Sequence, residues 1–291
     1  MAAQQGSGAG RPPIGAGANG AEGESRIGAD AGAFAAGRLE AGQVRAMFDR
    51  IAGVYDLMNT AMTAGLHHRW RARAVDLARV GPGSRVLDVA TGTGDMAIEL
   101  ARRVAPGGEV VGCDFAEGML DRARTKATGA RELWVCPRFE WADALALPYA
   151  DDSFDAATVG FGARNFDELR RGLAEMVRVV RPGGRVVVLE ITTPRRGPLS
   201  HFYRLWFDAI VPALGRAAGA ALALASLLGA SASREPIADA YTYLPSSVRR
   251  FPGPEALAAE LELAGLDEVH YLLTAGGIVA IHAGTVPAER A

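Results

Sequence analysis

The most regular feature of the chain is an alternation of short apolar runs with amphipathic segments between residues 85 and 191. The apolar runs are typical of strands, and the segments between them repeat apolar residues at helical spacing. Strands are predicted at 85–90, 109–115, 137–143, 153–161 and 185–191. Because strands that alternate with helices are joined by right-handed crossovers, we expect a parallel sheet with helices on both faces.

The regions on either side of this alternation have different patterns. Upstream, apolar residues recur at helical spacing over 43–62, and a second helix is predicted over 67–80. Downstream, a helix over 254–265 precedes two strands joined through 275–277, a connection so short that the pair must be antiparallel. The predicted fold class is therefore α/β: a doubly wound, mostly parallel seven-stranded sheet with an antiparallel edge hairpin.

The same patterns divide the chain into regions. Residues 1–42 are rich in Gly, Ala and small polar residues, which bury too little apolar surface to order a chain, so a disordered tail is expected. The rest should be one domain, 43–291, with N-terminal lid helices at 43–80 and an inserted helical region at about 198–240. Its apolar stretch 217–230 is too short to span a membrane and is interpreted as a core or lid helix, with membrane-surface contact as the alternative.

Composition narrows the class of protein. A formal net charge of −2 leaves no basic excess, which argues against nucleic-acid binding. The two cysteines, Cys113 and Cys136, have no metal-binding spacing, and we expect two buried thiols, no metal site and a reducing compartment. The N-terminus has no apolar signal segment, so a cytoplasmic protein is predicted.

The segment VLDVATGTGDMAIEL, residues 86–100, runs from a strand through a glycine turn into a helix. Its Gly92-x-Gly94-x-x-Ala97 pattern matches a dinucleotide-binding turn, but turns of this kind also hold S-adenosylmethionine (AdoMet). Asp88 and Asp95 flank the turn and would repel a diphosphate, whereas they attract the ammonium and sulfonium groups of AdoMet. The charge pattern therefore favours AdoMet over a nicotinamide dinucleotide.

Further acids follow the next two strands. Asp114, at the end of the second strand, is placed to accept hydrogen bonds from both ribose hydroxyls. Asp143 follows the third strand and is placed to accept from the adenine amino group, with the Ala144 backbone beside the ring. All of these residues lie at the carboxyl ends of parallel strands, where open sheets bind ligands.

Longer motifs carry a family resemblance. The segments VLDVATGTGD, GCDFAEGML, ADALALPYADDSFDAATVGFGARN and RVVRPGGRVVVLE are similar to those of the ubiquinone/menaquinone biosynthesis C-methyltransferase family. The similarity covers about residues 43–284, and YDLMN, FGARN and LTAGGIVAIH are more specific to this family than the glycine turn. The long Gly/Ala tail and the extra length near residue 220 depart from the family pattern.

The resemblance implies C-methylation of a prenylated quinol ring, which converts demethylmenaquinol to menaquinol, with S-adenosyl-L-homocysteine as the other product. It also implies AdoMet contacts at Thr93, Asp114, Asp143 and Ala144, in addition to the turn formed by Gly92 and Gly94. Because the substrate carries a prenyl chain, peripheral contact with the inner face of the cell membrane is expected. The oligomeric state is left open, a homodimer included.

One cofactor contact of the family is missing from the motifs. The residue before the FG of the fourth strand is commonly Ser, whereas this chain has Gly160. A hydroxyl contact is therefore lost at this position, and only the backbone remains.

The candidate catalytic residues come from the specific motifs. In FGARN, Arg164 could stabilise a phenolate and Asn165 could orient a hydroxyl group or water. In the lid helices, Tyr55 and the family-matching His67 would cover the site. The bland alternatives are a packed lid residue for Tyr55 and His67, and an ion pair with Asp143 or Glu190 for Arg164.

Three other functions remain open at this point. The chain could methylate another phenolic or lipid acceptor, it could be an NAD-dependent oxidoreductase, or it could be a non-catalytic quinone-binding subunit. Stabilisation by S-adenosylhomocysteine or by NADH in a thermal shift would separate these classes.

Overall fold

The computed structural model describes residues 39–130, 132–194 and 237–289, with six further residues between 209 and 220. Most of the predicted tail, and most of the inserted region with its apolar stretch 217–230, lie outside the described residues. No helix within the described part of the chain is long and apolar enough to cross a membrane.

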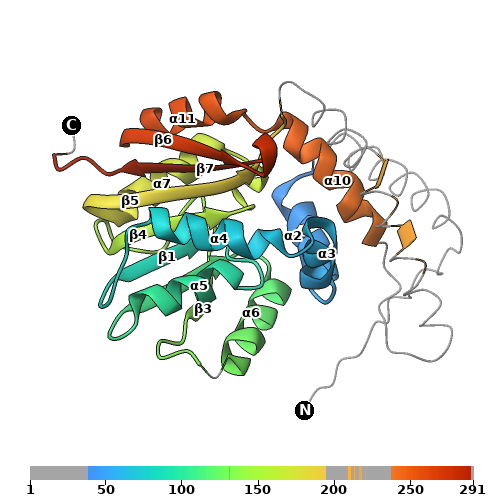
Figure 1. Ribbon diagram of the computed structural model, residues 1–291, viewed down its shortest axis with the longest axis horizontal. Coiled ribbons are helices and arrows are strands. Elements are labelled where there is room, and N and C mark those ends of the chain that lie inside the picture. Colours follow the sequence, from blue (N-terminus) through green and yellow to red (C-terminus); the bar gives the residue numbers. More distant parts are fainter. Residues whose placement is uncertain are drawn as a thin grey trace, which may run out of the picture.

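A seven-stranded sheet forms the centre of the molecule (Figure 1), as the alternating pattern predicted. Its strands are β1 (Arg85–Val89), β2 (Glu109–Asp114), β3 (Arg138–Trp141), β4 (Phe154–Gly160), β5 (Val180–Ile191), β6 (Asp267–Thr274) and β7 (Val279–Thr285). Their order is β3-β2-β1-β4-β5-β7-β6. The first five strands are parallel to one another, and β7 pairs antiparallel with both β5 and β6, which confirms the edge hairpin.

Helices cover both faces of this sheet. On one face, β1 buries Val86 against α5 (Asp95–Val104) and α6 (Glu117–Gly129). On the other face, the next residue, Leu87, packs with α7 (Leu169–Val179) and α11 (Pro254–Leu263). Successive strand residues point to opposite faces, so the continuous apolar runs in the sequence reflect burial on both sides.

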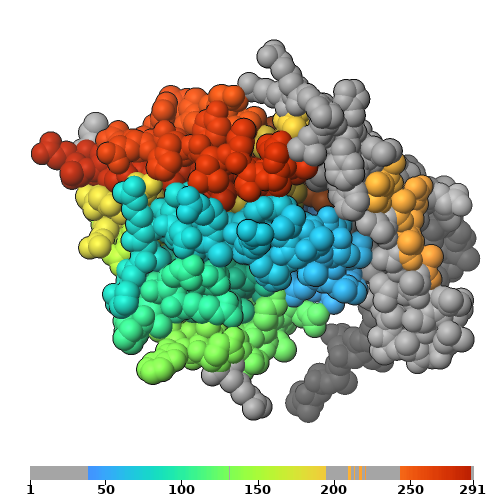
Figure 2. Space-filling view, viewed as in Figure 1, coloured from blue at the N-terminus to red at the C-terminus, as the bar shows by residue number. Residues whose placement is uncertain are grey.

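The N-terminal helices cover the end of the sheet where the site lies (Figure 1). They are α2 (Ala41–Ile51), α3 (Tyr55–Thr63) and α4 (Leu66–Leu77). Apolar residues of α2 and α3 form a separate small core with Met119 of α6 and Tyr243 of α10 (Ile237–Arg250). Figure 2 shows these helices as a blue surface that borders the C-terminal segment in orange and red.

Three local predictions need correction. The segment 43–62 is two helices and not one, because the chain turns at 52–54, where Gly53 favours a break. Strand β5 begins at Val180, immediately after α7, because Val180 pairs with Phe154 before a register shift. Cys113 is buried, but Cys136 is exposed because it lies in the loop before β3 and not within a strand.

Candidate active site

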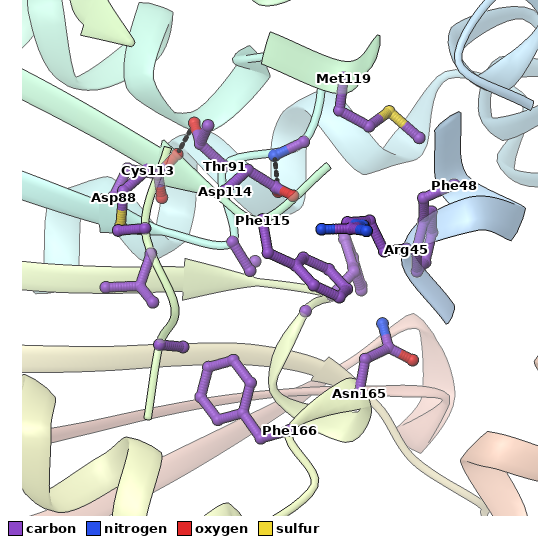
Figure 3. A pocket seen from close by; sticks show the side chains of 18 of the residues that line it. Arg45, Phe48, Asp88, Thr91, Cys113, Asp114, Phe115, Met119, Asn165 and Phe166 are labelled. Carbon is purple, nitrogen blue, oxygen red and sulfur yellow. Dashed lines mark hydrogen bonds between the residues drawn. The ribbon is translucent and has the colours of Figure 1, made fainter. Parts of the chain in front are cut away.

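A cavity of about 310 Å³ opens at the carboxyl ends of β1, β2 and β4. The loops after these strands form one side, and α2 covers the other, with Arg45 and Phe48 opposite Asp114, Phe115 and Asn165 in Figure 3. Seven of the ten predicted site residues line this cavity: Tyr55, Gly92, Thr93, Asp114, Asp143, Ala144 and Asn165. The other three, His67, Gly94 and Arg164, are not among the lining residues.

Asp114 is held rigidly at the end of β2. Its Oδ2 accepts a hydrogen bond of 2.8 Å from the backbone N–H of Gly92, and its Oδ1 accepts one of 2.9 Å from that of Ala116 (Figure 3 draws the first). Burial raises the pKa of Asp114 to about 6, despite these two backbone donors. The carboxylate therefore has two fixed oxygens with further lone pairs that can accept from a ligand.

Asp143 and Ala144 occupy a more open position after β3. Asp143 is exposed, and its Oδ1 accepts a hydrogen bond of 2.9 Å from the backbone N–H of Leu145. Ala144 is half-buried in the lining of the cavity. An exposed carboxylate competes with water for its partners, so Asp143 should contribute less to ligand binding than Asp114.

A charged network joins the lid helices to the glycine turn. The Thr93 hydroxyl donates to Asp56 Oδ1 at 2.6 Å, and Asp56 Oδ2 lies 2.7 Å from Lys126 Nζ. The same Lys126 Nζ is 2.7 Å from Asp95 Oδ1. The negative charge of Asp95 is thus already paired within the protein, so it attracts a cationic ligand less than the sequence suggests.

Asp88 is enclosed below the turn. It is fully buried and accepts hydrogen bonds from the hydroxyls of Thr91, at 2.6 Å, and Thr158, at 2.8 Å. Burial raises the pKa of Asp88 to about 6 although the two hydroxyls lower it. Asp88 thus adds a buried negative charge to the cavity lining at neutral pH, and its hydrogen-bond partners in the described part of the chain are two neutral threonines.

The glycines of the turn have different tasks. At Gly92, φ is +56° and a Cβ would point into open space, whereas at Gly94, φ is +82° and a Cβ would lie 2.9 Å from the Phe139 ring. Gly94 therefore shapes the turn against the core and does not face the ligand.

Gly160 lies at the end of β4, where the family commonly has a serine. A Cβ at Gly160 would lie 2.8 Å from Met96 Cε, so the methionine side chain fills the space where a serine side chain would lie.

Arg164 pairs with Glu190 of β5, the second of its two predicted ion-pair alternatives. Arg164 Nη1 lies 3.0 Å from Glu190 Oε2, and the two side chains are 6% and 2% exposed. The Arg164 backbone N–H also donates to Glu190 Oε1 at 3.2 Å, and its guanidinium donates to the Phe161 carbonyl. These contacts fix the 3-10 turn η1 (Ala163–Asn165) and keep the guanidinium outside the cavity lining.

Asn165, the next residue, does face the cavity (Figure 3). The Tyr243 hydroxyl donates to Asn165 Oδ1 at 3.2 Å. The amide oxygen of Asn165 thus already accepts one hydrogen bond, and its amide NH₂ is the group that can donate one to a ligand. Tyr55 lines the same cavity and packs edge-on against Phe48, with ring centroids 6.2 Å apart.

His67 supports the cavity wall from behind. It is 2% exposed, its Nδ1 accepts from Arg71, and its Nε2 lies 3.3 Å from the Thr60 hydroxyl. Burial, followed by the charge of Arg71, lowers the pKa of His67 to about 4. The imidazole is therefore neutral at pH 7, and both of its nitrogens are used in structural contacts. His67, His68 and Asp95 also cluster within metal-ligand distances, but Arg71 and Lys126 beside them would repel a cation.

Several lining residues were not predicted from the sequence: Arg45, Phe48, Arg71, Met96 and Phe161. Three of them lie on the lid helices, whereas Met96 lies on α5 after the glycine turn and Phe161 is the first residue of FGARN. The spacing of Arg45 and Phe48, one helical turn apart, places both on one face of α2 and was the available signal. Nothing in the motifs marked Arg71.

The residues of the cavity fit the chemistry of AdoMet. The space above Gly92 admits a ligand close to the backbone, and Asp114 presents a buried carboxylate where a ribose diol can donate to it. Among the described residues that line the cavity, acids outnumber arginines by five to two: Asp88, Asp95, Asp114, Asp143 and Asp167 against Arg45 and Arg71. This acidic excess suits a cationic ligand and disfavours a diphosphate.

The raised pKa of Asp114 predicts pH-dependent ligand binding. A protonated carboxyl accepts hydrogen bonds less well, so affinity for S-adenosylhomocysteine should fall below pH 6, by up to tenfold per pH unit. Calorimetric titrations between pH 5 and 8 would measure this. Asp88 titrates in the same range, and Asp114→Asn is the control, since its weaker binding should not change with pH if Asp114 is responsible.

Comparisons with solved structures show which fold this is. A SAM-dependent methyltransferase from Thermotoga maritima superposes with a TM-score of 0.52 at 19% identity, over 82% of this chain and 97% of that one. The [4+2]-cyclase SpnF superposes with a TM-score of 0.57 at 18% identity, over 86% and 98% of the chains. Similarity at this level shows the fold of AdoMet-dependent methyltransferases, and the cyclase shows that this fold alone does not determine the reaction.

The sequence comparisons identify the family. The model of the ubiE/COQ5 methyltransferase family matches residues 37–286, and the chain belongs to this family. The demethylmenaquinone methyltransferase of Thermus thermophilus is 48% identical over 241 residues, which are 83% of this chain and 100% of the relative. The enzyme of the same name from Deinococcus radiodurans is 46% identical over 80% of this chain and 88% of the relative. The protein is therefore an AdoMet-dependent methyltransferase, and the oxidoreductase alternative is not supported.

Proposed function

We propose that this protein transfers a methyl group from AdoMet to the ring carbon of demethylmenaquinol and forms menaquinol. The observation that carries this proposal is the similarity, at 46–48% identity over most of their length, to relatives named demethylmenaquinone methyltransferase. A ubiquinone/menaquinone biosynthesis C-methyltransferase of Geobacter sulfurreducens is also similar, but at a lower identity of 39% over 242 residues. The acceptor is therefore proposed to be a naphthoquinol rather than a benzoquinol.

The lining of the cavity supports an aromatic acceptor. The cavity is lined by the aromatic side chains of Phe48, Tyr55, Phe161 and Phe166. Aromatic side chains pack favourably on a flat ring in offset or edge-on arrangements. The quinol ring must enter the cavity while the prenyl chain of the same molecule lies in a bilayer. We therefore include peripheral contact with the inner face of the membrane in the proposal.

Asp114, Asp143, Ala144 and the turn at Gly92 and Thr93 would hold the adenosine part of AdoMet. When bound, AdoMet supplies an electrophilic methyl group on a sulfonium. The tasks left to the chain are to align the acceptor, exclude water and favour loss of the acceptor's hydroxyl proton.

Asn165 is proposed to act on the acceptor oxygen. Its free amide NH₂ would donate to the oxygen as negative charge develops there, a kind of contact worth about 10²–10³ in rate in other enzymes. Tyr55 would close the site from α3, and Arg164 would act as a positioning residue that holds Asn165 through Glu190. His67 would support Arg71 and take no proton during the reaction.

A methylation assay tests the proposal. The purified protein, AdoMet and a short-chain demethylmenaquinol kept reduced should yield menaquinol, seen by mass spectrometry as the addition of one methyl group. A demethoxylated benzoquinol and a simple naphthol serve as competing acceptors. We expect the naphthoquinol to be preferred by about tenfold or more. A stronger preference for either competitor would overturn the acceptor assignment while leaving the methyltransferase class intact.

A further inference from the structure

Arg71 of α4 is a buried arginine that reaches the cavity. Its side chain is 8% exposed, and its guanidinium carbon lies 5.4 Å from the centroid of the Phe161 ring. Arg71 Nη1 lies 3.4 Å from Asp95 Oδ2 and donates to His67 Nδ1. Arg45 is the other basic residue among the described residues that line the cavity, and Figure 3 shows it on α2 beside Phe48, facing Phe115.

The positive charge of Arg71 is only partly balanced by its neighbours. Asp95 is shared with Lys126, whose Nζ is closer at 2.7 Å to Oδ1 than Arg71 Nη1 is at 3.4 Å to Oδ2. The negative charge of Asp88 lowers the electrostatic potential around Arg71 further, but Asp88 hydrogen-bonds to two threonines and not to Arg71. The other direct partner, His67, is neutral at pH 7. Arg71 meets Asp95 and His67 through Nη1, so its other N–H groups can meet an additional anion while the ion pair with Asp95 is kept.

AdoMet has one anionic group at neutral pH, the α-carboxylate of its methionine part. Burying this group in a cavity with five acids is unfavourable unless a cation meets it. Guanidinium groups suit carboxylates because their donors can form two parallel hydrogen bonds. Arg71 Nη1 lies 3.4 Å from Asp95 of the glycine turn, and Lys126 links the same Asp95 to Thr93. Arg45 instead faces Phe115, the residue after Asp114, in Figure 3.

We propose that Arg71 binds the α-carboxylate of AdoMet and so makes the site selective for cofactors that retain this group. The proposal rests on the proposed function only in taking AdoMet as the ligand and does not depend on the acceptor. The proposal also assigns a role to His67. As a neutral hydrogen-bond acceptor, His67 orients Arg71 without cancelling the charge of the guanidinium. Because Arg71 lies on α4, carboxylate binding links the cofactor to the lid helices.

The test compares two ligands that differ in the carboxylate alone. Calorimetry would measure the affinity of S-adenosylhomocysteine and of its decarboxylated analogue, S-adenosyl-3-thiopropylamine, for the whole protein. We expect the wild-type chain to prefer S-adenosylhomocysteine by roughly 10- to 100-fold, the range of a hydrogen-bonded charge pair. Arg71→Met should remove most of this preference, with a change below about threefold for the analogue, and Arg71→Lys should keep part of it.

Arg45→Met is the matched control, since it also removes a cavity arginine but should leave the ratio of the two affinities unchanged. Equal losses for both ligands in Arg71→Met would show a purely structural role and overturn the proposal. So would a wild-type chain that binds both ligands equally, a result that needs no variant to fold. Failure of the wild type to bind either ligand would instead refute AdoMet as the cofactor, and a normal wild-type ratio with no quinol methylation would refute the acceptor alone.

Discussion

Replacing Asp114 with alanine is expected to weaken the binding of S-adenosylhomocysteine by roughly 10²- to 10⁴-fold. Two ribose hydroxyls would lose a charged acceptor, at about 1.5–3 kcal/mol for each hydrogen bond. The backbone N–H groups of Gly92 and Ala116 would also lose their acceptor, which loosens the turn that the ligand rests on. Isothermal calorimetry on the purified variant measures the change.

The fold should survive this substitution. The pKa of Asp114 is raised to about 6 by burial, so the folded state disfavours its charge at neutral pH. Because the folded pKa lies above the unfolded value of about 3.9, this group stabilises the fold at low pH and ceases to do so as the pH rises through 6. The neutral Asp114→Asn variant removes this cost of burial at pH 8 but turns its amide NH₂ toward one of the two backbone N–H donors, so we expect an unfolding temperature close to that of the wild type.

Asp143→Ala is the control for Asp114. It removes an acid of the same cavity, but an exposed one, so we expect a loss of binding of about tenfold or less. If Asp114→Ala bound S-adenosylhomocysteine within threefold of the wild type, the assignment of this carboxylate to the ribose would be wrong.

Replacing Arg164 with methionine is expected to lower both stability and turnover. The substitution would leave the Glu190 carboxylate buried without its cation, and breaking one side of a buried pair costs about 3–5 kcal/mol. The η1 turn would also lose a tether, and a shift of Asn165 by about 1 Å could reduce turnover by about 10²-fold. Thermal unfolding and steady-state kinetics would measure the two effects, with little change in cofactor affinity.

The double substitution Arg164→Met, Glu190→Gln separates the two interpretations of Arg164. If Arg164 only positions Asn165, removing the orphaned charge should restore most of the stability and a good part of the turnover. If the guanidinium itself stabilises the acceptor oxygen, the double variant should regain its stability while its turnover stays low. Near-normal turnover of Arg164→Met alone would exclude both roles.

Much of the fold could be predicted because its signals are local. Strand positions follow from apolar runs, and the antiparallel hairpin follows from a connection of four residues, 275–278, which leaves the chain no other direction. Asp114 could be placed at the site for a similar reason: it ends a strand in a parallel sheet, and all such ends meet at one edge. The break near Gly53 was missed because a single glycine inside a helical pattern is often tolerated.

Local sequence patterns were enough to predict the α/β alternation, the glycine turn and the acids at the strand ends, and the longer motifs indicated the family. Which charges can meet a ligand depends on how the helices and strands pack together. Arg164 forms an ion pair with Glu190, 26 residues away, and Asp95 forms one with Lys126 of α6. Arg71 lines the cavity from a lid helix. Ion pairs of this kind depend on how separate elements pack and on which side chains become buried together, and neither is written in the local periodicity of the chain.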